Sequence, residues 1–267
     1  MLRVELFKAS RRWRTYLMGA ALGGIPLILV MSLLLSQGPA SGDDGPPFYA
    51  LIARNGFFAP LAALGALQVF LLPLTAGLLS GDVIAGEASL GTLRYLLVRP
   101  VGRGRLVAAK YGCAVILLAL MVTWVEAIAL AAGGLAYGLD SMPTLSGTVL
   151  GAGAAVGRIG LAGAYIVTGM AALAAVGVFA SVLTDSAPGA TVATVGLAIV
   201  SQILDSLSAL SALHPFLISH RWLAFVDLFR APVVWTSLID GLILHACYAT
   251  VFLGAAVLVF RRRDVHN

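Results

Sequence analysis

Long apolar runs alternate with short polar or charged connections along this chain. A membrane-spanning helix needs about 20 consecutive, mostly apolar residues. Runs of this kind occur at about residues 15–35, 59–79, 111–136, 161–183, 188–207 and 238–260. The pattern therefore predicts an all-α, polytopic integral membrane protein with six transmembrane helices.

Prolines mark irregular points in two of these runs. Pro26 lies inside the first run and Pro73 interrupts the second, and a proline removes a helical hydrogen bond and bends the helix. The first run also has a possible cleavage region after it, at residues 38–41. However, it is longer than the 7–15 apolar residues of a signal peptide, so we expect a membrane anchor.

Two segments outside the runs favour the membrane surface. Residues 1–14 interleave five basic side chains with apolar ones, which fits either a helix lying in the interface or a plain basic flank. Residues 208–237 are less apolar and carry Trp222 and Trp235, a residue type enriched at membrane interfaces. We expect short extracytoplasmic helices there, lying on or dipping into the membrane.

The distribution of lysine and arginine predicts the orientation. Of the 17 basic residues, residues 1–14 and 80–110 hold five each and the C-terminal end holds three. The connections on the opposite side hold the remaining four: Arg54, Arg158, Arg221 and Arg230. Because cytoplasmic loops are enriched in positive charge, both termini and the 80–110 segment are predicted to be cytoplasmic in a plasma-membrane protein.

The composition supports this interpretation. Hydrophobic residues make up 60% of the 267 residues and charged residues only 11%, whereas soluble domains are about 25% charged. The net charge of +5 collects at the ends of apolar runs, which argues against nucleic acid as a partner. The whole chain, 1–267, is expected to be a single transmembrane domain.

Motifs of catalysis and cofactor binding are absent from the sequence. Neither lysine lies in a GxxxxGK[ST] motif, so the chain cannot cradle nucleotide phosphates as P-loop ATPases do. There is no HExxH or GxSxG motif. His214 and His220 are six residues apart, which is only a weak indication of metal. We therefore expect no enzyme activity, no metal site and no cofactor in this chain.

Three polar side chains lie inside the predicted spans: Gln68, Glu126 and His245. An ionisable group in the membrane interior is costly and faces a cavity or a partner. Such residues form either a substrate or proton site or a hydrogen-bonded contact between helices, and packing is the simpler interpretation of each.

The 80–110 segment differs from the other connections because it holds seven charges. Thr92 can cap a short helix with Leu93 and Leu97 on one face and Arg94 on another. Pro100 would end that helix. The result is a short amphipathic helix at the membrane surface, suited to binding a soluble partner.

The order of residues in this segment resembles the type-2 ABC transporter permeases, the membrane subunits of one class of ABC exporters. The family pattern D-x-x-x-x-E-x-x-x-G-T-L-R-x-L-L-x-x-P-V-x-R-x-x-L-x-x-x-K is matched at Asp82, Glu87, Gly91, Thr92, Leu93, Arg94, Leu97, Pro100, Arg103 and Lys110. An E-L-x-K element occurs at Glu5–Lys8 and a closing F-R-R-R-D at Phe260–Asp264. The six-span layout agrees, so the resemblance covers essentially the whole chain.

The resemblance implies that residues 80–105 form a coupling helix that docks on a separate ATP-binding subunit. ATP and magnesium would then be bound by that partner. It also implies pairing of this chain with itself or with a related permease, and alternating access as the mechanism. Because the chain has no large outer domain, we expect export of a small or amphipathic substrate.

Two alternatives from other classes remain open. A secondary transporter would use Glu126 as a proton or ion site and work without an ATPase. A membrane scaffold would bind a partner through 80–105 and transport nothing, while a plain positively charged topology loop leaves the order of Glu87, Gly91, Thr92 and Pro100 unexplained.

Overall fold

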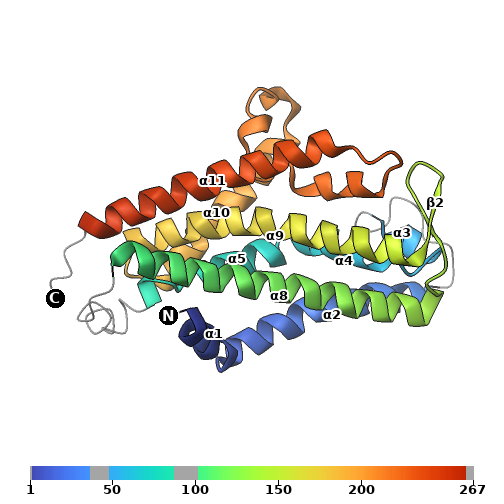
Figure 1. The fold of residues 1–267 in the computed structure, drawn as a ribbon, viewed down its shortest axis with the longest axis horizontal. Coiled ribbons are helices and arrows are strands. Elements are labelled where there is room, and N and C mark those ends of the chain that lie inside the picture. The colour runs from blue at the N-terminus through green and yellow to red at the C-terminus, as the bar shows by residue number, and fades with distance from the viewer. Residues whose placement is uncertain (1, 37–47, 87–101, 263–267) are drawn as a thin grey trace.

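The computed structural model describes residues 2–36, 48–86 and 102–262. Long helices run side by side along its long axis and form an elongated bundle (Figure 1). Those long and apolar enough to cross a membrane are α2 (Trp13–Leu35), α8 (Arg103–Tyr137), α9 (Ala152–Leu183), α10 (Ala187–Ser206) and α11 (Trp235–Arg262). The predicted all-helical, polytopic architecture is confirmed.

The predicted second span is a bent pair of helices, α4 (Phe58–Val69) and α5 (Leu71–Gly81), with an angle of 58° between them. Pro73 has no N–H to bond the carbonyl oxygen of Val69, four residues earlier. That oxygen instead accepts a hydrogen bond of 3.0 Å from the side-chain amide of Gln202 on α10. Counted as one span, the pair is the sixth among the described residues.

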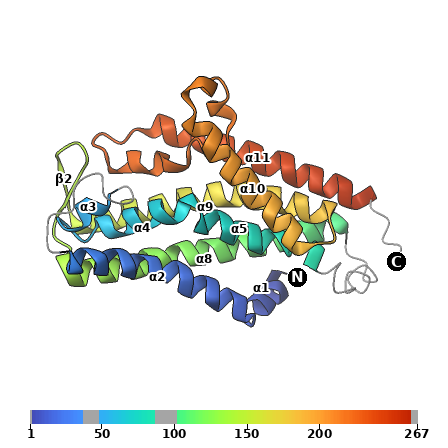
Figure 2. The same ribbon diagram turned by 180° about the vertical axis from the view of Figure 1, so that it is seen from behind.

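Helix α9 lies at the centre of the bundle and packs against α5, α8, α10 and α11. The main core gathers around it, with fully buried residues such as Leu64, Leu118 and Ile166. Seen from behind, α10 crosses α5 and α9 obliquely (Figure 2). The most deeply buried of the candidate membrane spans is thus the fourth predicted span.

The 137–160 connection was predicted wrongly in part, because residues 152–160 belong to α9. Arg158 explains this extension: its guanidinium donates to the carbonyl oxygens of Leu228 at 2.7 Å and Arg230 at 3.1 Å. The connection that remains contains a small antiparallel hairpin, β1 (Met142–Pro143) and β2 (Val149–Leu150). This hairpin is bound to the 208–237 region through the amide of Leu145, which donates to Phe229 O.

Shorter helices complete the described fold. The N-terminal segment forms α1 (Leu2–Ser10), and α3 (Tyr49–Ile52) precedes α4. Between α10 and α11 lie three 3₁₀ helices, η1 (Ser208–Leu210), η2 (His214–Phe216) and η3 (Trp222–Phe229). Residues 207–221, here called the lobe, project from the long side of the bundle (Figure 1).

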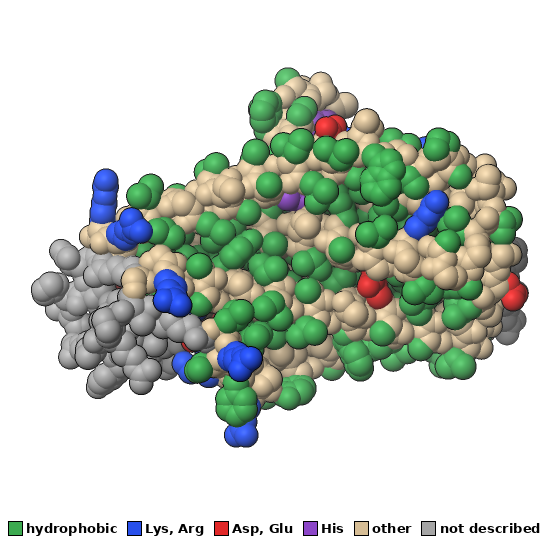
Figure 3. Space-filling model, viewed as in Figure 1, with side chains coloured by type: hydrophobic (Ala, Val, Ile, Leu, Met, Phe, Trp, Pro, Cys, Tyr) green, Lys and Arg blue, Asp and Glu red, His purple; other side chains and the backbone are tan. Residues whose placement is uncertain are grey.

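Helix α1 and the C-terminal end of α11 lie at the same end of the bundle (Figure 1). On the face shown in Figure 3, hydrophobic side chains cover the middle, and most of the lysine and arginine side chains lie toward this end. A basic end and an apolar girdle are the surface expected of a multi-pass membrane protein.

Candidate functional site

The structure describes the two ends of the predicted coupling segment, residues 80–86 and 102–110. Most of the predicted docking residues lie outside the described residues: Glu87, Gly91, Thr92, Leu93, Arg94, Leu97 and Pro100. Asp82 directly follows α5, and Arg103 is the first residue of α8. The site therefore consists of the two anchors that hold the segment to the bundle.

The first anchor is a buried hydroxyl on the central helix. Ser181 of α9 accepts hydrogen bonds from the backbone amides of Ile84 at 3.0 Å and Ala85 at 2.8 Å, and it donates to Gly81 O at 2.8 Å. Its side chain is fully buried. One serine thus satisfies the last carbonyl of α5 and two amides of the residues that follow it.

A separate apolar cluster joins both ends of the segment to the bundle. Its buried members are Val83, Ile84, Leu106, Val107, Val178, Val182, Ala256 and Phe260. The first two follow α5, the next two open α8, and the others belong to α9 and α11. Both ends of the segment are therefore packed directly against α9 and α11.

The second anchor is a pair of ionic contacts with the N-terminal region. The guanidinium of Arg12, just before α2, lies 2.5 Å from a carboxylate oxygen of Asp82. On α1, Glu5 lies 3.4 Å from the ammonium of Lys110, whose side chain is only 6% exposed. A pocket of about 330 Å³ lies between α1, α2, α5 and α8 and is lined by all four of these residues.

Sequence reasoning found some of these residues and missed others. Asp82, Glu5, Lys110 and Phe260 were already part of the quoted motifs. Ser181 was missed, because a single serine in an apolar run has no distinguishing spacing. The pairing of Arg12 with Asp82, 70 residues apart, was also beyond what spacing alone predicts.

Two of the predicted intramembrane polar residues, Gln68 and His245, meet at Trp222. The amide of Gln68 donates to Trp222 O at 3.1 Å. The ring of His245 and the indole of Trp222 both lie against Gly169 of α9, where a Cβ atom would be 3.2 Å from each ring. Nδ1 of His245 bonds to the hydroxyl of Thr168 at 2.9 Å. These contacts join α4, α9, η3 and α11, while Gln68 Oε1, Trp222 Nε1 and His245 Nε2 have no hydrogen-bond partner among the described residues.

Glu126 lies apart from Gln68, His245 and Trp222 and faces Gly163 instead. Its carboxyl packs against Gly163 of α9, and its side chain is 8% exposed. Among the described residues, its Oε1 atom has no hydrogen-bond partner. A Cβ atom at position 163 would overlap the carboxyl, so a larger residue there would force the Glu126 side chain to move.

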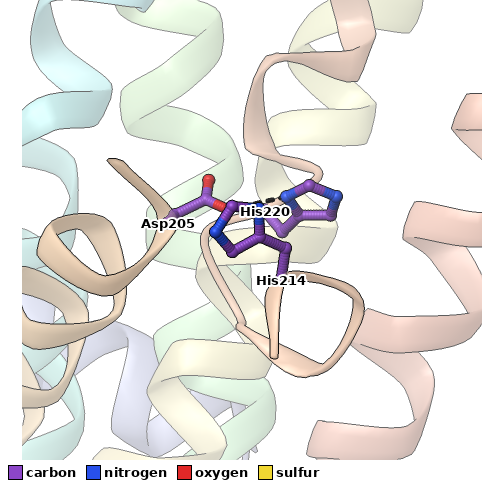
Figure 4. Close-up of side chains that lie close together, drawn as sticks. All are labelled: Asp205, His214 and His220. Atoms are coloured by element: carbon purple, nitrogen blue, oxygen red, sulfur yellow. Dashed lines mark hydrogen bonds and ion pairs between the residues drawn. The ribbon is translucent and has the colours of Figure 1, made fainter. Parts of the chain in front are cut away.

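The lobe places two histidines beside a carboxylate of α10, a grouping that local sequence does not predict. His214, His220 and Asp205, at the end of α10, lie next to one another (Figure 4). In the sequence, the two histidines alone gave only a weak indication of metal. Their geometry is considered below.

Comparison with known proteins agrees with this architecture. A family model described as "ABC-2 family transporter protein" matches residues 1–204, which include α1 to α9 and most of α10. The match therefore includes both anchors and the whole 80–110 segment.

Two individual relatives are named as ABC transporter permeases, in agreement with the family model. The chain is 34% identical over 126 residues to "Probable ABC transporter permease protein NosY" of Stutzerimonas stutzeri, which covers 42% of this chain and 41% of that protein. It is 49% identical over 53 residues to the protein of the same name from Pseudomonas aeruginosa, covering 20% and 19%. The matched regions thus span less than half of these relatives. Because the family model covers more than half of this chain, the protein belongs to the ABC-2 family of transporter proteins.

Proposed function

We propose that this chain is the membrane-spanning permease subunit of an ABC exporter, and that a separate ATP-binding subunit drives it by docking on residues 80–110. The anchoring of both ends of this segment to α9 and α11 is the observation that carries the proposal. A docking element that moves helices must be attached rigidly to them, and Ser181 together with the apolar cluster provides that attachment.

The mechanism follows from these attachments. ATP-driven closure of the partner displaces the segment, and its two ends pass the displacement to α5 and α8. From there it reaches α9 through Ser181 and α11 through Phe260. The two arrangements of the helices must bind the ATPase with different affinity, since only a difference in affinity shifts their populations.

The orientation and assembly belong to the same proposal. The basic end that carries α1 faces the cytoplasm, where the ATPase resides. Two permease chains, identical or related, form the path for a small or amphipathic substrate between them. Apolar side chains such as Val192 and Ile203 of α10 are more than half exposed and available for contact with lipid or with a second permease.

The test is a pull-down from detergent-solubilised membranes, followed by mass spectrometry of the proteins that co-purify. We expect a Walker-motif ATPase with the wild type, and its loss from a Glu87→Ala, Thr92→Ala, Arg94→Ala triple variant. An Arg54→Ala, Asp140→Ala variant is the control, because both side chains are exposed and lie outside the segment. Absence of an ATPase from the wild-type sample would refute the proposal.

A further inference from the structure

Three potential metal ligands lie close together where the lobe meets the end of α10. Asp205 lies one residue before the end of α10, His214 opens η2, and His220 lies two residues before η3. One ligand atom from each residue lies within 4.8 Å of the others (Figure 4). All three side chains are partly buried, with exposed fractions of 26%, 18% and 28%.

The hydrogen bonds of His214 determine which of its ring nitrogens is available. Nε2 lies 3.2 Å from the carbonyl oxygen of Leu207, which can only accept, so the proton of the neutral ring is on Nε2. Nδ1 then carries a lone pair, and it faces a carboxylate oxygen of Asp205 at 4.0 Å. A metal-bound histidine commonly donates its second N–H to a backbone carbonyl in this way.

The arginines near Asp205 pair with other carboxylates. The two arginines of this connection are engaged elsewhere: Arg221 pairs with Asp240 at 3.4 Å and Arg230 with Asp227 at 2.8 Å. Within the described ranges, the carboxylate of Asp205 therefore faces two imidazoles rather than a lysine or arginine, with His220 Nδ1 at 2.7 Å. Two acceptors that face each other, His214 Nδ1 and the carboxylate, are stabilised by a cation between them.

We propose that Asp205, His214 and His220 bind a divalent transition-metal ion of the zinc class. Two imidazoles and one carboxylate form a known three-ligand set for zinc and leave a fourth position open to water or another ligand. With bonds of about 2.1 Å, tetrahedral ligand atoms are about 3.4 Å apart. His214 Nδ1, 4.0 Å from the Asp205 carboxylate, must therefore move closer, while His220 Nδ1, at 2.7 Å, must move away and release the proton that it donates to this carboxylate. Magnesium and calcium prefer oxygen ligands throughout and do not fit.

The ion fastens the lobe to the end of α10. It closes the loop between residues 205 and 220, and His220 is followed closely by Trp222, which packs against Gly169 of α9. Metal binding therefore orders the connection that joins α10 to the centre of the bundle.

The experiment measures Zn²⁺ binding to the purified full-length chain, prepared without a histidine tag and treated with a chelator. Competition with a chromophoric chelator gives the stoichiometry and affinity, and Co²⁺ absorption reports the coordination geometry. We expect one zinc ion per chain, no competition by Mg²⁺, and affinity at least about 100-fold weaker in Asp205→Asn and His214→Ala, since even loss of an outer partner costs 10–100-fold.

Asp240→Asn is the matched control, because this carboxylate is 58% exposed and pairs with Arg221 outside the cluster. The unfolding midpoint in chelator establishes that each variant is folded, and added zinc should raise this midpoint in the wild type and in Asp240→Asn only. The proposal is overturned if the wild type binds no stoichiometric zinc, or if folded His214→Ala and Asp205→Asn proteins bind it as tightly as the wild type.

Discussion

Helices α9 and α11 have the same mean hydropathy, 2.2, in their most apolar stretches, yet 67% of that stretch is buried in α9 and only 11% in α11. Their difference lies in side-chain size. Helix α9 has ten alanines and six glycines among 32 residues, whereas α11 has four alanines and two glycines among 28. In a membrane, close packing rather than hydropathy holds helices together, and small residues allow it.

The two helices also differ in what surrounds their glycines. Gly163, Gly169 and Gly177 of α9 touch side chains of other elements. On α11, Gly241 packs against Tyr165, but Gly254 has no atom within 4 Å of the place where a Cβ would lie. Only one side of α11 is therefore committed to the bundle, and the rest is available to lipid or to another protein.

The largest expected effect comes from filling one of the close contacts of α9. In Gly177→Val, the new Cβ would lie 2.9 Å from Ser80 Cβ and 3.0 Å from Thr194 Oγ1, so α5 and α10 must move away. We expect a loss of about 3 kcal/mol or more in unfolding free energy, measured by denaturant titration in detergent. Gly254→Val adds the same side chain to α11 and should be nearly neutral; equal losses in both variants would show that the contrast is not one of packing.

Hydropathy was sufficient to predict that these spans exist, but α8 already begins at Arg103 rather than at residue 111. The first, fifth and sixth predicted spans match α2, α10 and α11 to within three residues at each end. It was not sufficient for the start of α9, because Gly153, Gly157 and Arg158 are typical of a loop. Arg158 lies in a helix because its guanidinium donates hydrogen bonds to the carbonyl oxygens of Leu228 and Arg230. These acceptors are 70 and 72 residues away in the sequence.

A smaller effect is expected from the buried hydroxyl of α9. Ser181→Ala removes the hydroxyl that accepts from the amides of Ile84 and Ala85, and an unsatisfied buried group costs about 1–3 kcal/mol. The unfolding free energy should fall by this amount. Thr250→Ala on α11 is the control, since this exposed hydroxyl bonds only to the backbone of its own helix.

Ser181→Ala also tests the proposed transmission of force. The variant should still co-purify with the ATPase, because the docking residues are intact, while ATP hydrolysis by the complex should no longer respond to the permease. Normal coupling in a folded Ser181→Ala protein would mean that the apolar cluster around Phe260 transmits the movement without this serine.

The candidate site could be predicted only as far as local order carries information. The order of Asp82, Glu87 and Pro100 identified the segment, because a motif confined to a short stretch of chain can be recognised from local sequence. Its anchors, Ser181 and Arg12, lie far away in the sequence and are ordinary residues there. The same holds for Asp205, His214 and His220, which become neighbours only when the lobe folds back onto α10.

The smallest effect is expected at Glu126, where α8 meets α9. Glu126→Gln keeps the shape of the side chain against Gly163 and removes an ionisable group whose Oε1 has no partner among the described residues. We expect a change below about 1 kcal/mol in unfolding free energy and unchanged ATP hydrolysis by the reconstituted complex. Gly163→Ala, which places a Cβ against the carboxyl, should cost more than Gly160→Ala, which meets no atom within 4 Å. If Glu126→Gln instead abolished transport in a protein of unchanged stability, Glu126 would be a proton or ion site rather than a packing contact. That result would favour the secondary-transporter alternative.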